Sequence, residues 1–143
     1  MKRIIVLITV VLFLVSFAFT TYADVEEPPV LEEDIEEYVN IRTASVTLSI
    51  DNSGTAAITI KCVGFSGTTH ISSRTYLERW NGSSWSRVSF NGASEIVDGV
   101  SASSMTRTYT TTVGSGQYRA TTIFTVTRGT DETITVYSST VTH

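Results

Sequence analysis

Cysteine, histidine and proline are scarce in this chain, and each scarcity removes a class of protein. Cys62 is the only cysteine, and His70 and His143 are the only histidines. One cysteine excludes a disulfide framework and a multi-cysteine zinc site, and two histidines leave little for metal binding or acid–base catalysis. Both prolines stand together at Pro28-Pro29, so no proline interrupts a strand in the rest of the chain.

Basic residues are also few. The 143 residues include 10 basic and 14 acidic side chains, a formal net charge of −4. The chain therefore lacks the basic footprint of a nucleic-acid-binding protein. Its length allows one domain, and 41 % hydrophobic residues suffice for a packed core.

The N-terminus has the three parts of a secretory signal peptide. Lys2 and Arg3 supply the basic start, residues 4–19 are almost entirely apolar, and Thr21 and Ala23 are the small residues before a cleavage site. We expect cleavage after Ala23, which makes residues 1–23 a signal peptide and the product a free secreted protein. The alternative is an uncleaved membrane anchor, although the apolar run is shorter than the ~20 residues that span a bilayer. After cleavage we expect no further contact with a membrane.

Residues 24–40 form an acidic segment. Eight carboxylates lie between Asp24 and Tyr38 without a basic residue among them, whereas the chain after Asn40 has eight basic and six acidic side chains. Blocks of like charge repel one another, so we expect this segment to be a mobile, solvated leader. The alternative is a propeptide or a docking arm.

Residues 41–143 have the composition and periodicity of strands. They contain 21 threonines and 17 serines, and apolar residues alternate with polar ones along Thr43–Ile50 and Thr55–Val63. Turn residues separate the alternating runs, as in Asn81-Gly82. The expected strands are 43–50, 55–63, 70–80, 85–90, 102–113, 117–127 and 133–142, with a loop over 91–99. Seven strands without a helical period predict an all-β domain, an antiparallel β-sandwich.

One tripeptide carries a resemblance to known domains. Tyr118-Arg119-Ala120 resembles the Tyr-x-Val or Tyr-x-Cys of the sixth strand in immunoglobulin-like and fibronectin type III domains. Together with the signal peptide, the hairpin over 77–85 and Tyr137-Ser138-Ser139, it is similar to a group of small secreted proteins of Gram-positive bacteria without an established activity. The resemblance implies that Tyr118 is the corner tyrosine, whose hydroxyl bonds to the upstream backbone. The chain departs from the immunoglobulin pattern at Ala120, where the second disulfide cysteine would stand, so Cys62 has no partner.

The residues that could perform chemistry each have a structural interpretation. Cys62 alternates with Ile58 and Ile60, which predicts a buried small hydrophobe. The alternative, a reactive thiol, requires exposure and a neighbouring cation. His70 opens a strand and is expected at the surface, and the carboxylates of the body are dispersed. No nucleophile elbow, phosphate loop or zinc motif occurs. We therefore expect no enzyme, no cofactor and no metal site.

Aromatic and arginine residues are the better candidates for a binding site. The candidate binding residues are Tyr76, Arg79, Trp80, Trp85 and Arg87. Exposed aromatic rings on a β-sandwich can stack on sugar rings. Two alternatives are that one tryptophan fills the core, or that the pair stabilises its own hairpin. Alternation places several arginines on outward faces, where they can pair with Glu78 or the acidic segment, or form a binding patch for an acidic polymer.

These observations favour a non-catalytic exported β-sandwich with a structural or binding role. The alternative is a module that binds carbohydrate or a cell-wall polymer through its tryptophans and arginines. The partner is then a glycan or a surface protein, and nucleic acid is not expected.

Overall fold

The computed structural model describes residues 38–143, and the structural statements below concern that part of the chain. The expected signal peptide, its expected cleavage site after Ala23 and residues 24–37 of the acidic segment lie outside the described residues. Nine strands follow one another: β1 (Ile41–Ile50), β2 (Thr55–Gly64), β3 (His70–Trp80), β4 (Trp85–Val88), β5 (Ile96–Val100), β6 (Ser104–Thr112), β7 (Gln117–Arg128), β8 (Thr130–Tyr137) and β9 (Val141–Thr142). Residues 38–143 contain no helix, so none there could cross a membrane. The predicted all-β class is confirmed for this part of the chain.

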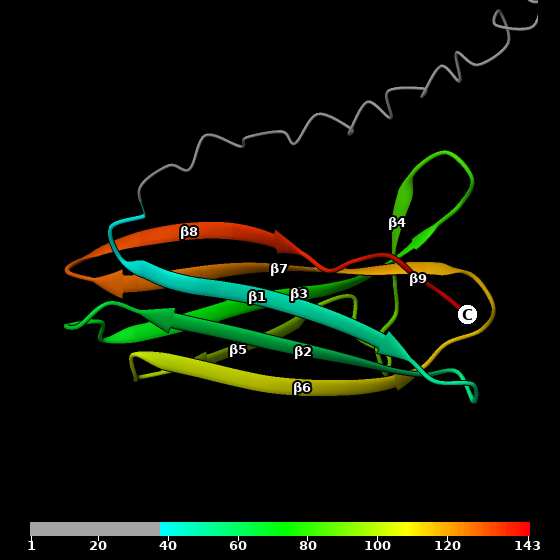
Figure 1. Ribbon diagram of the computed structural model, residues 1–143, viewed down its shortest axis with the longest axis horizontal. Helices are drawn as coiled ribbons and strands as arrows, with labels where there is room; N and C mark the ends of the chain where they lie inside the picture. Colours follow the sequence, from blue (N-terminus) through cyan, green and yellow to red (C-terminus); the bar gives the residue numbers. More distant parts are fainter. Residues whose placement is uncertain (1–37) are drawn as a thin grey trace, which may run out of the picture. The chain divides into compact units, whose positions relative to one another are not determined.

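The strands form two antiparallel sheets (Figure 1). The small sheet has the order β1-β2-β6, and the large sheet has the order β4-β3-β7-β8, with β5 paired to β3 and β9 paired to β7. The longest pairing of the large sheet joins β3 to β7, from His70 opposite Thr127 to Arg79 opposite Tyr118. This central pair fixes which side chains of the large sheet become neighbours.

Alternation along the strands sends one set of side chains into the space between the sheets. Ile58, Ile60 and Cys62 of β2 are fully buried, on the strand face that alternation predicted. Phe124 and Val126 of β7 meet them from the large sheet, and the buried residues of both sheets belong to one hydrophobic cluster. Two sheets that share one core are the arrangement of a β-sandwich.

The structure differs from the expected elements in two places. The expected loop over 91–99 contains most of β5, a short strand that pairs with β3. The expected strand over 133–142 is interrupted between β8 and β9. There the N–H of Ser138 donates to the carbonyl of Ala120 at 2.8 Å, and the Ser138 hydroxyl accepts from the N–H of Ala120 at 2.8 Å. Because a side chain replaces a strand carbonyl as the acceptor, the ladder stops and resumes at Val141.

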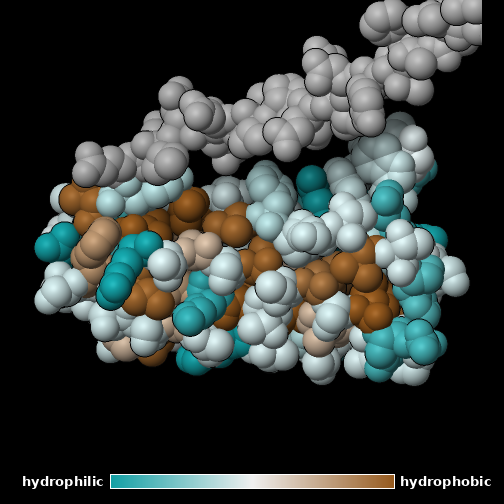
Figure 2. Space-filling view, in the orientation of Figure 1, coloured by the Kyte–Doolittle hydropathy of each residue, from teal (hydrophilic) through white to brown (hydrophobic). Residues whose placement is uncertain are grey.

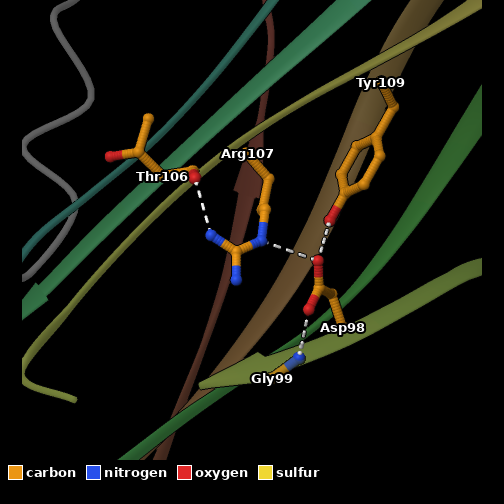
Figure 3. Close-up of polar contacts among 5 residues, drawn as sticks. All are labelled: Asp98, Gly99, Thr106, Arg107 and Tyr109. Atoms are coloured by element: carbon orange, nitrogen blue, oxygen red, sulfur yellow. Dashed lines mark hydrogen bonds and ion pairs between the residues drawn. The ribbon is translucent and has the colours of Figure 1, made fainter. Parts of the chain in front are cut away.

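Asp98 of β5 joins the edges of the two sheets (Figure 3). Its Oδ2 accepts from Arg107 Nε and from the Tyr109 hydroxyl of β6, both at 2.9 Å, and its Oδ1 accepts from the N–H of Gly99 at 2.7 Å. Desolvation alone would raise the pKa of Asp98, but the three donors outweigh it and lower that pKa. Burial, and then the bond to Asp98, raise the pKa of Tyr109 to about 12.

Glu132 of β8 fixes the point where the chain enters the domain. Its carboxylate accepts the N–H groups of Val39 at 2.8 Å, Asn40 at 2.7 Å and Ile41 at 2.9 Å. Arg128 Nη1 adds a bond to the Val39 carbonyl at 3.1 Å. We call these contacts the Glu132 clamp. Val39 itself is 67 % exposed. Figure 2 shows that hydrophobic residues reach the surface at several places on this side of the domain.

Candidate functional site

The β3–β4 hairpin presents both tryptophans of the chain. Asn81 begins its turn, and the Asn81 Oδ1 accepts the N–H groups of Ser83 and Ser84, both at 2.9 Å. Such a side-chain bond to the backbone two residues on is the means by which asparagine closes a tight turn. The turn sets Trp80 directly opposite Trp85. In Figure 1 this hairpin stands out from the body of the two sheets.

The two indole rings contact one another across the hairpin. Their centroids are 5.4 Å apart and their planes are tilted by 56°, a geometry that aromatic pairs prefer over a parallel sandwich. Trp80 is 36 % exposed and Trp85 is half-buried. Neither tryptophan fills the core, so that alternative is wrong. The rings support the hairpin and also offer an apolar surface to the solvent.

Arg119 of β7 lies between two aromatic rings on the same face of the large sheet. Its guanidinium carbon is 4.6 Å from the centroid of Trp85 and 4.8 Å from that of Tyr137. Its Nε donates to Glu78 Oε2 at 2.7 Å, and Thr121 Oγ1 donates to the same oxygen at 2.8 Å. Two rings and a carboxylate therefore hold this arginine in one orientation.

Arg87 of β4 is held by a second aromatic ring. Its guanidinium carbon lies 3.6 Å from the centroid of Tyr76, whose ring is buried and whose hydroxyl donates to Glu95 Oε2 at 3.0 Å. Arg87 itself is exposed. The stack orders the guanidinium plane and leaves its N–H groups directed to the solvent.

We call these residues of the large sheet the arginine–aromatic face; they are Tyr76, Glu78, Trp80, Trp85, Arg87, Arg119 and Tyr137. Four of the five predicted binding residues lie in it. The fifth, Arg79, points to the other side of β3, as expected for a neighbour of Trp80 in a strand. There its Nη2 donates to the Ser115 carbonyl at 2.7 Å. Together with Trp80 it lines an open hollow of about 440 Å³ at the hairpin.

The five predicted binding residues do not include Glu78, Arg119 or Tyr137. Glu78 lies opposite Arg119 because β3 pairs with β7 in this register, and Tyr137 comes from β8. The period-2 pattern showed that each side chain points outward. It carried no information on which outward residues of distant strands are neighbours.

The outer face of the small sheet has a different chemistry. Its cross-strand rows consist of Ser45–Lys61–Thr106, Thr47–Thr59–Thr108 and Ser49–Ala57–Thr110. Hydroxyl groups dominate these rows, and they contain one charged residue. Ordered arginines and exposed aromatic rings thus occur on one of the two outer faces.

The remaining candidates lie away from this face. Cys62 is buried without a disulfide, and desolvation raises the pKa of its thiol to about 11. His70 is exposed at the start of β3. Within residues 38–143, no group of three or more histidine, cysteine or acidic residues is placed to hold a metal ion. The Tyr118 hydroxyl donates to the Gly114 carbonyl at 2.9 Å, which is the upstream contact implied for a corner tyrosine.

Comparisons of the chain with protein-family models, with curated protein sequences and with solved structures give no significant match.

Proposed function

We propose that the protein is a non-catalytic binding module that acts through the arginine–aromatic face. The observation that carries this proposal is the ordering of Arg87 and Arg119 on aromatic rings beside the exposed ring of Trp80. A surface that orders its side chains in advance loses less conformational entropy on binding. The two carboxylates of this region are engaged, Glu78 by Arg119 and Glu95 by the Tyr76 hydroxyl, which favours recognition over acid–base chemistry.

We infer that the domain is of the immunoglobulin or fibronectin type III kind. Two features support this inference. The orders β1-β2-β6 and β3-β7-β8 correspond to the strand orders A-B-E and C-F-G of such sandwiches. The second feature is the bond from Tyr118 to Gly114, four residues upstream, at the start of β7.

We also propose that the protein is exported, on the basis of its N-terminal sequence alone. Mass spectrometry of the protein from the culture medium of its host should find Asp24 as the first residue. Recovery of the chain with Met1 or Lys2 still attached would contradict cleavage.

Carbohydrate, including cell-wall polymers, is the ligand class that the exposed ring of Trp80 favours. Trp80 and Trp85 are the only tryptophans of the chain, so intrinsic tryptophan fluorescence reports on this site alone. Titration with soluble neutral and acidic polysaccharides should change that fluorescence. The substitution Trp80→Ala should weaken binding at least tenfold, whereas Lys61→Ala, on the outer face of the small sheet, should leave it unchanged. Binding that is indifferent to Trp80→Ala, or no binding at all, would favour a purely structural role.

A further inference from the structure

On the arginine–aromatic face, one carboxylate, Glu78, lies between two arginines. Glu78 lies opposite Arg87 on one side and opposite Arg119 on the other. Its carboxylate bonds to Arg119 at 2.7 Å. Among residues 38–143, only Arg107 and Arg119 form ion pairs. Arg87 is therefore left without a carboxylate, although its cross-strand neighbour is one.

Arg87 is nevertheless in a fixed orientation. The buried ring of Tyr76 covers one side of its guanidinium at 3.6 Å, and Glu95 holds the Tyr76 hydroxyl. The N–H groups of a guanidinium lie in one plane, which is the geometry that binds a carboxylate through two parallel hydrogen bonds, and stacking on the ring fixes the orientation of that plane. The contacts within the protein thus prepare Arg87 for an acceptor that the protein does not supply.

An apolar platform lies next to this arginine. Trp85 is two residues from Arg87 on β4, which is about 7 Å along a strand, and its partner Trp80 is exposed. A carboxylate on Arg87 and a ring stacked on Trp80 fit neighbouring units of one chain of sugars.

The spacing of the charges disfavours a dense polyanion. Arg74 is the next exposed arginine on this face of β3. It stands four positions before Glu78, the residue opposite Arg87, and four positions span about 13 Å along a strand. The acidic residues Glu78 and Glu95 lie in the same region. Such a surface suits a polymer with one charge per sugar ring better than a chain of closely spaced phosphates.

We propose that the arginine–aromatic face binds a polysaccharide that bears carboxylate groups, with Arg87 as the carboxylate anchor and Trp80 as the ring platform. This inference rests on the proposed function and names its ligand class. A chain of uronic acid residues carries a carboxylate on each pyranose ring, so it presents a carboxylate to Arg87 and a neighbouring ring to Trp80.

The test uses tryptophan fluorescence of the full chain with three soluble polymers. They are polygalacturonate, its methyl-esterified form, which has the same rings without the charge, and polyphosphate, which has charge without rings. Polygalacturonate should bind at least tenfold more tightly than either of the others. Arg87→Gln should weaken polygalacturonate binding at least tenfold and change binding of the ester less than twofold. Arg42→Gln removes an exposed arginine from β1 of the small sheet, and its effect should stay within twofold.

The other outcomes separate the two proposals. Equal, Trp80-dependent binding of acid and ester would overturn the carboxylate inference and leave the binding module standing. Binding of polyphosphate as tight as that of polygalacturonate, with equal losses in Arg42→Gln and Arg87→Gln, would show attraction by general charge and also overturn it. If none of the three polymers changes the fluorescence, the carboxylate inference fails, and the titrations with neutral polysaccharides decide whether the binding module stands.

Discussion

Burial decides what the one thiol of this protein can do. Cys62 is fully buried and desolvation raises its pKa to about 11, so very little thiolate, the reactive form, exists near neutral pH. A thiol reagent at pH 8 should leave the native protein unlabelled for hours and label one group at once in denaturant. Cys62→Ala should still fold, with a loss of about 1–2 kcal/mol for the small cavity. Rapid labelling of the native protein would contradict burial.

The hydroxyl of Tyr118 is a second group whose contribution to stability depends on its surroundings. Its ring is buried and its oxygen donates to Gly114 at 2.9 Å. Tyr118→Phe should lower the free energy of unfolding by about 0.5–1.5 kcal/mol, the net value of one such hydrogen bond. The matched control is Tyr137→Phe, since Tyr137 is 56 % exposed. Urea unfolding should show a lower midpoint for the first variant alone; equal midpoints would remove the structural role of the Tyr118 hydroxyl.

At the scale of elements, β5 depends on its connection to β6. Asp98 supplies that connection through Arg107 and Tyr109. Asp98→Asn keeps the shape but removes the charge, and should cost about 1–2 kcal/mol, because a charge-assisted bond is strong but this pair is partly exposed. Asp131→Asn, on an exposed residue of β8, should cost less than about 0.5 kcal/mol.

Hydrogen exchange offers an independent measure of the same connection. In Asp98→Asn the amides of β5 should exchange faster, while those of the central pair β3 and β7 should keep their protection. Unchanged exchange in β5 would show that pairing with β3 alone holds this strand.

For the whole molecule, the lowered pKa values of Asp98 and Glu132 predict acid sensitivity. For Glu132, desolvation raises the pKa but the three backbone N–H groups outweigh it. A carboxylate whose folded pKa is below its unfolded value, about 4, stabilises the protein above that pH, and this contribution disappears as pH falls through the folded pKa. Tyr109, with its raised pKa, acts in the opposite sense: its contribution is complete below pH ~10 and is lost as pH rises through about 12.

Urea unfolding measured from pH 2 to 7 tests this expectation. The midpoint should be level above pH 5 and fall steadily below pH 4. In Asp98→Asn the fall should be shallower, because one of the three carboxylates with a lowered pKa (Asp51, Asp98 and Glu132) is gone. A midpoint that does not change with acid would contradict the assignment of these carboxylates.

The Glu132 clamp sets the N-terminal limit of the domain. A protein that begins at Tyr38 keeps the bonds to Val39, Asn40 and Ile41, and its thermal midpoint should lie within a few degrees of that of the full chain. Any difference should shrink in ~0.5 M salt, which screens the acidic segment. A protein that begins at Arg42 loses all three bonds, about 1 kcal/mol each at most, and should melt roughly 5–15 °C lower. Failure of the longer protein to fold at any salt concentration would show that residues before 38 belong to the core.

The sequence by itself was sufficient to predict those strands that are marked by alternating polar and apolar residues within the strand itself. Alternation in Thr55–Val63 placed Ile58, Ile60 and Cys62 on one face, and the structure buries all three. The short β5 was not predicted, because it has few residues to show a period. It is held by pairing with β3, which is distant in sequence, and by the bonds that its own Asp98 accepts from Arg107 and Tyr109 of β6.

The arginine–aromatic face was decided only by the tertiary structure. Trp80 and Trp85 are neighbours through a local turn, so the sequence could pair them. Arg119 reaches Glu78 and Tyr137 only because β7 pairs with β3 on one side and with β8 on the other. That register is set by the packing of the core, in which a slip of one residue would turn every outward side chain inward. Period and turn residues therefore determined which side chains face the solvent, while the long-range pairing of strands determined which of them stand together.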